Sequence, residues 1–193
     1  MAAYITRERI DAVVDATHPF AARMSANAAL ACEATETPLV VFTRLPWTRE
    51  PGDRWVEVGT MDDAVEALGE QPRTVFLTQG RLQLAAFGRA PQHRYVVRAI
   101  DRRADSGALP HAKLILTRGP FSLDDELALM KRERVEALVT KNSGGHATYA
   151  KIEAARALGI EVVIMRRPPA PEAETLHDLG AVISWITAHR LSP

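Results

Sequence analysis

Residues 135–168 place the strongest constraint on the fold, because they read as a strand, a turn, a helix and a second strand in direct succession. Residues 137–140 are short and apolar, which is typical of a buried parallel strand. Small or apolar residues then recur with a helical period over residues 147–158, and Gly159 stands where a helix C-cap is expected. Because residues 161–165 read as the next strand, the segment predicts a β-α-β unit.

Strands and helices alternate in this way along the whole chain, which predicts parallel sheets covered by helices on both faces. The expected strands span residues 10–15, 38–43, 55–58, 74–78, 95–100, 113–117, 137–140 and 161–165. Three of them precede Pro72 and five follow it, so the first series looks incomplete. We therefore predict an α/β protein with a truncated N-terminal domain, residues 1–72, and a C-terminal domain, residues 73–193.

Composition excludes several classes of protein. The chain has 193 residues, of which 47% are hydrophobic and 25% charged, as is ordinary for a globular protein. Its formal net charge is zero, which argues against a general nucleic-acid binder. We expect a cytoplasmic protein without membrane partners, because there is neither a membrane-length apolar run nor a signal-peptide pattern. The single Cys32 excludes a disulfide framework, and the six His residues lack metal-ligand spacing, so we predict no protein-bound metal.

The turn after residues 137–140 combines a cation, an amide, a hydroxyl and two glycines. These residues are Lys141, Asn142, Ser143, Gly144 and Gly145. Glycine lets backbone N–H groups approach a ligand, and the start of a helix adds partial positive charge, so the loop suits an anion. The alternative is a tight turn with a serine cap and a solvated lysine, and the local sequence leaves both interpretations open.

Basic residues follow nearly every expected strand. They are His18, Arg44, Arg81, Arg118, Lys141, Arg166 and Arg167. Ligands of open α/β sheets bind at the carboxyl ends of the strands, so these side chains predict a positive edge that suits a large polyanion or two anionic ligands. The alternative is that basic residues flank strands in any α/β protein and that an Arg-rich composition supplies them.

Four stretches together resemble the precorrin-6A reductases: Asp-Ala-Thr-His-Pro-Phe-Ala at 15–21, Arg-Gly-Pro-Phe at 118–121, Thr-Lys-Asn-Ser-Gly-Gly at 140–145 and Arg-Pro at 167–168. They span nearly the whole chain in the order of that family. The resemblance implies two Rossmann-like domains with cofactor and tetrapyrrole in the cleft between them. It also implies hydride transfer from NADPH to a ring double bond of precorrin-6A, giving the dihydro product in cobalamin (vitamin B12) biosynthesis. The acetate and propionate groups of that macrocycle make it a large polyanion.

The resemblance also suggests roles for individual residues. Lys141 is the catalytic candidate, because a cation or acid stabilises or protonates the negative charge that hydride transfer places on the macrocycle. The candidates for binding the cofactor are Thr17, His18, Asn142, Ser143, Gly144 and Gly145. The candidates for pairing with substrate carboxylates are Arg44, Arg81, Arg118 and Arg167. For His18, a capping role with a bond to the backbone is an equal alternative.

The chain departs from this family at its start. Members open with a strand and a Gly-Gly-Thr-x-Glu turn, whereas this sequence begins about one βαβ unit later, on the order of 30 residues or more. We therefore expect that a front unit precedes Met1 in a complete protein. Two alternatives from other classes are a nucleotide-dependent transferase with two domains and a tetrapyrrole-binding module without catalysis.

Overall fold

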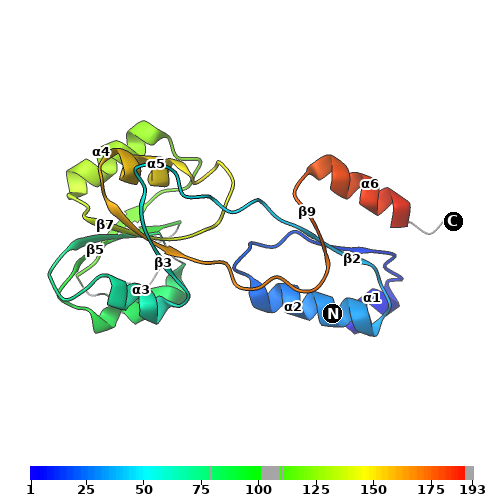
Figure 1. Cartoon of the computed structure of the whole chain (residues 1–193). Coiled ribbons are helices and arrows are strands. Elements are labelled where there is room, and N and C mark those ends of the chain that lie inside the picture. The colour runs from blue at the N-terminus through cyan, green and yellow to red at the C-terminus, as the bar shows by residue number, and fades with distance from the viewer. Residues whose placement is uncertain (79, 101–108, 110, 190–193) are drawn as a thin grey trace. The chain divides into compact units, whose positions relative to one another are not determined.

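The computed structural model describes residues 1–78, 80–100, 109 and 111–189 and contains two compact units (Figure 1). Unit 1 consists of Met1–Leu45 and Pro168–Pro193, and unit 2 consists of Pro46–Arg167. Each unit is built on a parallel sheet with helices packed against it. The predicted α/β class with two parallel sheets is therefore confirmed.

Unit 2 contains a sheet of six parallel strands in the order β3-β8-β7-β4-β5-β6. The strands are β3 (Arg54–Val58), β4 (Thr74–Leu77), β5 (Arg94–Ala99), β6 (Lys113–Leu116), β7 (Ala137–Lys141) and β8 (Glu161–Met165). From β4 the chain adds β5 and β6 on one side, and then returns to add β7 and β8 on the other. This is the doubly wound order of Rossmann-like folds, in which ligands bind at the carboxyl ends of the strands where the order reverses.

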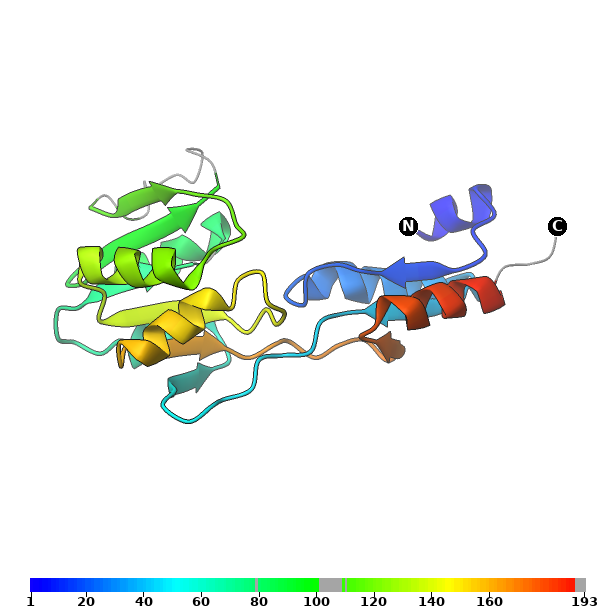
Figure 2. The same ribbon diagram turned by 90° about the horizontal axis from the view of Figure 1, so that it is seen from above.

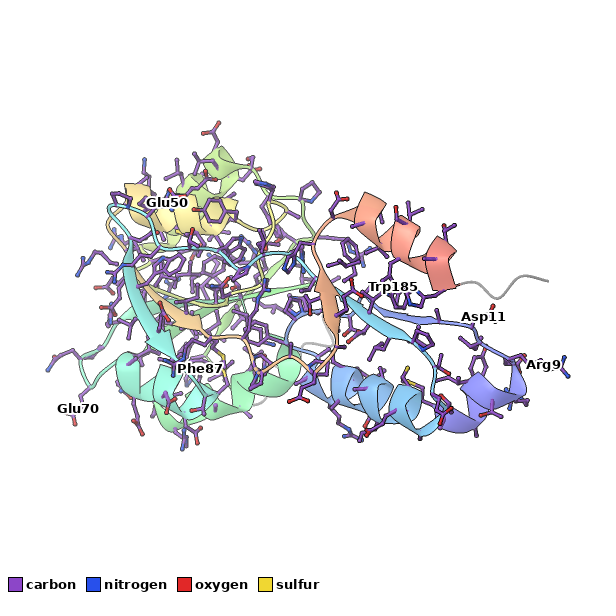
Figure 3. The ribbon with its side chains drawn as sticks, turned by 45° about the vertical axis from the view of Figure 1, so that its right-hand side comes forward. Arg9, Asp11, Glu50, Glu70, Phe87 and Trp185 are labelled. Atoms are coloured by element: carbon purple, nitrogen blue, oxygen red, sulfur yellow. The ribbon has the colours of Figure 1, made fainter. Side chains whose placement is uncertain are left out.

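Helices cover both faces of this sheet. They are α3 (Met61–Ala67), the 3-10 helix η1 (Arg81–Arg89), α4 (Leu123–Glu133) and α5 (Ala150–Ala157). Figure 1 shows α4 and α5 on one face and α3 on the other, where η1 packs beside α3. Phe87 of η1 is completely buried (Figure 3). Because both faces are covered, residues 137–140 of β7 and 162–165 of β8 are buried, and all of them except Thr140 are apolar.

Short polar residues begin two of these helices. The Thr60 hydroxyl accepts a hydrogen bond from Asp63 N, and the Asp63 carboxylate accepts one from Thr60 N, which is the reciprocal capping box. The Ser122 hydroxyl likewise accepts from Asp125 N at the start of α4. Both caps satisfy N–H groups that the first turn of a helix leaves without partners.

The domain boundary predicted after residue 72 does not coincide with these units. β3 precedes that boundary, yet it pairs with β8 along its whole length, from Arg54 opposite Glu161 to Val58 opposite Met165. Residues Pro168–Pro193, which were predicted to belong to the C-terminal domain, belong to unit 1. The prediction assigned each strand to the series in which it occurs along the chain, whereas β3 joins a sheet whose other strands all come later.

Unit 1 contains three parallel strands in the order β1-β2-β9. Its elements are α1 (Ala2–Arg7), β1 (Val13–Asp15), α2 (Ala22–Ala34), β2 (Leu39–Phe42), β9 (Glu174–Leu176) and α6 (Leu179–His189). Helices α2 and α6 flank the sheet (Figure 2). Trp185 of α6 is buried and donates from Nε1 to the Glu174 carboxylate at 2.9 Å (Figure 3). This bond ties α6 to β9 through their side chains.

A buried ion pair joins α4 to β5. Glu126 is 1% exposed, and Arg98 donates to both of its carboxylate oxygens, from Nη1 at 2.6 Å and from Nη2 at 3.0 Å. The Arg98 guanidinium also packs over the rings of Phe76 and Phe121, 4.8 and 4.0 Å from their centroids. The bidentate geometry and the aromatic contacts offset the loss of hydration that both charges suffer on burial.

We expect Arg98→Met to lower the free energy of unfolding by about 3–5 kcal/mol, because it leaves the Glu126 carboxylate buried without its partner. The matched control is Arg94→Met on the same strand. Arg94 is 48% exposed, and its partner Glu133 also pairs with Lys113 and Arg132, so that change should lower the free energy by about 1 kcal/mol or less. Urea unfolding curves measure both values, and equal losses in the two variants would contradict the prediction.

Candidate functional site

The carboxyl ends of all six strands of unit 2 lie at one edge of its sheet, because every pairing is parallel. The basic residues that follow these strands are Arg81 after β4, Arg118 after β6, Lys141 at the end of β7, and Arg166 and Arg167 after β8. The backbone of Arg81 begins η1, but its side chain lies outside the part of the chain that the structure describes. The predicted alignment of strand ends is therefore confirmed for unit 2.

The loop between β7 and α5 needs its two glycines. Gly144 and Gly145 have φ angles of 68° and 70°, in the left-handed region that side chains with a Cβ adopt only with strain. The strand ends at Lys141, and the helix begins at Ala150. Two consecutive residues with left-handed φ turn the chain sharply between the strand and the helix.

Trp47 holds this loop with three hydrogen bonds. Trp47 N donates to Asn142 Oδ1 at 2.7 Å, Asn142 Nδ2 donates to Trp47 O at 2.9 Å, and Trp47 Nε1 donates to Gly145 O at 2.8 Å. We predicted that Asn142 binds a cofactor, but both ends of its amide group bond to the main chain of Trp47. Asn142 therefore fixes the shape of the loop. Trp47 was missed in the sequence, where the only hint was a large aromatic residue in an irregular connection.

Arg167 bonds to the same loop. Its Nε donates to Asn142 O at 2.9 Å, and its Nη2 donates to Ser143 O at 3.1 Å. We predicted that Arg167 pairs with a substrate carboxylate, whereas these two donors bond to main-chain carbonyl groups. A planar guanidinium suits this task, because its fork reaches two adjacent acceptors at once.

Several N–H groups of the loop have no acceptor in the part of the chain that the structure describes. Ser143 N donates to Lys141 O at 2.8 Å, and Tyr149 N donates to His146 O at 3.1 Å. Between them, the N–H groups of residues 144–148 have no hydrogen-bond acceptor among the described residues. The segment leads directly into α5, whose N-terminus has no side-chain cap. Backbone donors next to a helix N-terminus favour a bound anion.

Lys141 lies half-buried where β7 meets this loop. Burial lowers the pKa of its ammonium group below the ordinary value for lysine, because the charged form loses hydration. A lysine with a lowered pKa gives up its proton more readily than an exposed one does. Lys141 can therefore supply positive charge or a proton to an anion that forms beside it.

Lys151 lies beneath the loop, in the first turn of α5. It is 6% exposed, and its Nζ donates to Thr148 O at 2.8 Å and lies 5.0 Å from the centroid of the Trp47 ring. Burial lowers the pKa of Lys151 to about 7, while Glu126 raises it and Arg98 lowers it. This burial could not be expected from the local sequence, because a lysine in a helix is usually exposed.

In unit 1, two of the predicted residues follow β1. Thr17 N donates to the buried Asp15 carboxylate at 3.0 Å, and the Thr17 hydroxyl lies 3.3 Å from that of Ser25. Burial raises the pKa of Asp15, but hydrogen bonds from Ser25 and Thr17 outweigh it and leave the pKa below its ordinary value. Phe20 N donates to His18 Nδ1 at 3.2 Å, which is the backbone bond that the alternative interpretation of His18 expected.

Arg44 is exposed and follows β2, also in unit 1. Thr17, His18 and Arg44 thus belong to unit 1, whereas the other predicted site residues belong to unit 2. Across the described ranges, no group of three or more His, Cys, Asp or Glu residues is placed to hold a metal ion. Among the helices of those ranges, none has the length and apolar character required to cross a membrane.

Comparisons with known proteins agree on one family. The sequence model of the family described as precorrin-6x reductase CbiJ/CobK matches residues 1–187. The chain is 42% identical over 190 residues to the precorrin-6A reductase of Rhodobacter capsulatus, covering 98% of this chain and 76% of that protein. It is 47% identical over 178 residues to the precorrin-6A reductase of Rhodococcus erythropolis, covering 92% and 71%. A solved structure described as CobK precorrin-6A reductase superimposes with a TM-score of 0.95 at 42% identity, covering 100% of this chain and 79% of that one.

We expect Lys151→Met to change how stability depends on pH. Between the native pKa of about 7 and the unfolded value near 10.4, the unfolded chain binds one more proton than the native one at this site. The free energy of unfolding of the wild type should therefore gain a contribution that rises with pH, by at most about 1.4 kcal/mol per pH unit. The variant lacks this contribution, so its advantage over the wild type should be largest below about pH 7 and should shrink towards pH 10.

Urea unfolding at several pH values measures the difference between the two proteins. Lys131→Met on α4 is the matched control, because Lys131 is exposed. The difference in the free energy of unfolding between Lys131→Met and the wild type should not vary with pH between about 7 and 10. The prediction fails if the two Met variants follow the same pH dependence.

Proposed function

Because the chain belongs to the precorrin-6x reductase family CbiJ/CobK, we propose that it reduces precorrin-6A with NADPH as the hydride donor. The chain is an oxidoreductase. A hydride passes from the nicotinamide ring to one atom of a C=C or C=N bond of the macrocycle, and a proton is added to complete the reduction. The products are NADP⁺ and the dihydro tetrapyrrole.

The observation that carries the assignment of the cofactor site is the loop between β7 and α5. It lies at the carboxyl end of β7, and β7 adjoins β4, where the strand order of the sheet reverses. The N–H groups of residues 144–148 face no acceptor among the described residues, and phosphate oxygens are strong acceptors. We assign a phosphate group of the cofactor to the Ser143 hydroxyl and to the N–H groups of Gly144, Gly145 and His146, with Asn142 holding the loop. Thr17 and His18 remain proposed cofactor-binding residues.

The remaining roles follow from charge. Lys141 is proposed to stabilise or protonate the macrocycle as the hydride arrives, since burial lowers the pKa of its ammonium group towards that of a useful acid. Arg44, Arg81 and Arg118 are proposed to bind the carboxylates of the substrate. Arg167 is assigned to the loop, because its Nε and Nη2 donate to Asn142 O and Ser143 O.

The direct test is to follow nicotinamide absorbance after adding precorrin-6A to the purified chain with NADPH. Oxidation that requires both the protein and the tetrapyrrole supports the reductase. Tetrapyrrole binding without oxidation would instead favour a binding module, and indifference to both ligands would favour a transferase. The same assay with NADH in place of NADPH measures the preference for the cofactor.

Lys141→Ala should lower kcat by about 100-fold or more, the usual contribution of a group that transfers a proton, with a smaller effect on the KM for NADPH. Its melting temperature should stay close to that of the wild type, because Lys141 is half-buried at the end of a strand. Lys141→Arg distinguishes the two roles, since arginine keeps the charge but does not release a proton. Recovery of kcat in that variant indicates charge stabilisation, and unchanged kcat in Lys141→Ala would remove the lysine from the site.

Arg118→Gln and Arg44→Gln should each raise the KM for the tetrapyrrole by about tenfold, the effect of losing one charge-assisted contact. The matched control is Arg54→Gln, because Arg54 begins β3 and so lies at the opposite edge of the sheet from Arg118. Raising the salt concentration should weaken wild-type binding, since exposed charges are screened. Steady-state kinetics measure the three KM values, and equal values for all of the variants and the wild type would exclude these contacts.

A further inference from the structure

We propose that Trp47 is a positioning residue for the cofactor: by holding main-chain carbonyl groups of the loop between β7 and α5, it and Arg167 fix the direction of the N–H groups that bind phosphate. The inference rests on the cofactor site proposed above. It assigns to Trp47 a role in ligand binding without contact with the ligand.

Within the loop, the carbonyl groups and the N–H groups differ in whether they have hydrogen-bond partners among the described residues. The carbonyl groups of residues 142, 143, 145, 146 and 148 accept hydrogen bonds from Arg167, Trp47, Tyr149 and Lys151. The N–H groups of residues 144–148 have no acceptor in the described part of the chain. A carbonyl oxygen repels an anion, and an N–H group attracts it. These five carbonyl groups, which would oppose phosphate, are thus bonded, whereas the N–H groups that would attract phosphate have no acceptor among the described residues.

The planarity of the peptide bond links the two sets of groups. In a trans peptide, the C=O of one residue and the N–H of the next point in opposite directions. The described cis bond of the chain is Gly119–Pro120, outside this loop. Arg167 holds Ser143 O and so directs Gly144 N–H away from itself. Trp47 Nε1 holds Gly145 O and in the same way directs His146 N–H away from the indole.

These peptides need to be held, because glycine permits many backbone conformations. The peptide between Gly145 and His146 follows two residues with φ near 70°. Without a partner for Gly145 O, this peptide can rotate, and its N–H group then loses its direction. A donor that is fixed before the ligand arrives binds more tightly, since ordering it costs nothing at the moment of binding.

Trp47 is itself well fixed. It is 9% exposed, and the Asn142 amide bonds to both its N–H and its C=O groups. Its ring centroid lies 5.7 Å from that of Tyr149, and the Lys151 ammonium group is 5.0 Å from it. The indole therefore presents its N–H group to Gly145 O from a rigid position.

The chain offers a matched pair of substitutions. Trp47→Phe keeps a buried aromatic ring and removes the bond from Nε1 to Gly145 O. Trp55 of β3 is 8% exposed, and its Nε1 is buried without a partner among the described atoms. Trp55→Phe therefore removes an indole of similar burial from the same unit without removing a hydrogen bond.

Titration calorimetry with NADP⁺ provides the test. Trp47→Phe should raise the Kd for NADP⁺ by about fivefold, as expected for one lost hydrogen bond, whereas Trp55→Phe should change it by less than about twofold. At saturating NADPH, the kcat of Trp47→Phe should stay near that of the wild type, because the change weakens binding and leaves the reacting groups in place. If Trp47→Phe does not fold, Arg167→Lys tests the same loop, because lysine keeps the positive charge but lacks the planar fork that bonds to Asn142 O and Ser143 O. This variant should also raise the Kd for NADP⁺ by about fivefold.

The outcomes separate this inference from the function on which it rests. A wild-type chain that does not bind NADP⁺ would overturn the cofactor assignment, and the positioning role with it. A wild type that binds NADP⁺ while Trp47→Phe binds equally well would overturn the positioning role alone. Equal losses in Trp47→Phe and Trp55→Phe would also overturn it, because they would indicate general loosening of unit 2.

Discussion

The paired hydrogen bonds between the Asn142 side chain and the main chain of Trp47 are the contact on which the candidate site depends. They join the segment that precedes β3 to the loop that follows β7, 95 residues later in the chain. The Trp47 indole then fixes Gly145 O, and Arg167 fixes Asn142 O and Ser143 O. Two glycines with left-handed φ make the turn possible, but these neighbours determine which of its conformations the loop adopts.

Charge is distributed unevenly in a chain whose formal net charge is zero. The parallel sheet of unit 2 collects basic side chains at the carboxyl ends of its strands, where an anionic ligand binds in folds of this kind. Beneath the loop, Lys151 is buried within the influence of the Glu126–Arg98 pair. The site therefore combines a positive edge at the ends of the strands with a buried lysine in α5 and a buried ion pair that joins α4 to β5.

Local patterns predicted much of this structure. Apolar runs identified the strands, the Thr60 and Asp63 spacing identified a helix start, and the sequence Lys-Asn-Ser-Gly-Gly identified a loop whose glycines have φ > 0. Contacts between distant segments could not be predicted in this way. Because β3 pairs with β8 and β2 pairs with β9, the boundary between the units differs from the one predicted. The hydrogen bonds of Trp47 and Arg167 to the loop could not be predicted from the residues next to them in the sequence.

NMR of the chain labelled with ¹⁵N-glycine tests most directly whether the backbone of the loop between β7 and α5 binds the phosphate of a cofactor. Of the 11 glycines, Gly144 and Gly145 belong to the loop, whereas Gly69 and Gly159 precede β4 and β8 at the other edge of the sheet. On addition of NADP⁺, the amide protons of Gly144 and Gly145 should shift downfield as they donate to phosphate oxygens, and those of Gly69 and Gly159 should not move. Binding of NADP⁺ that leaves Gly144 and Gly145 unshifted would contradict the account.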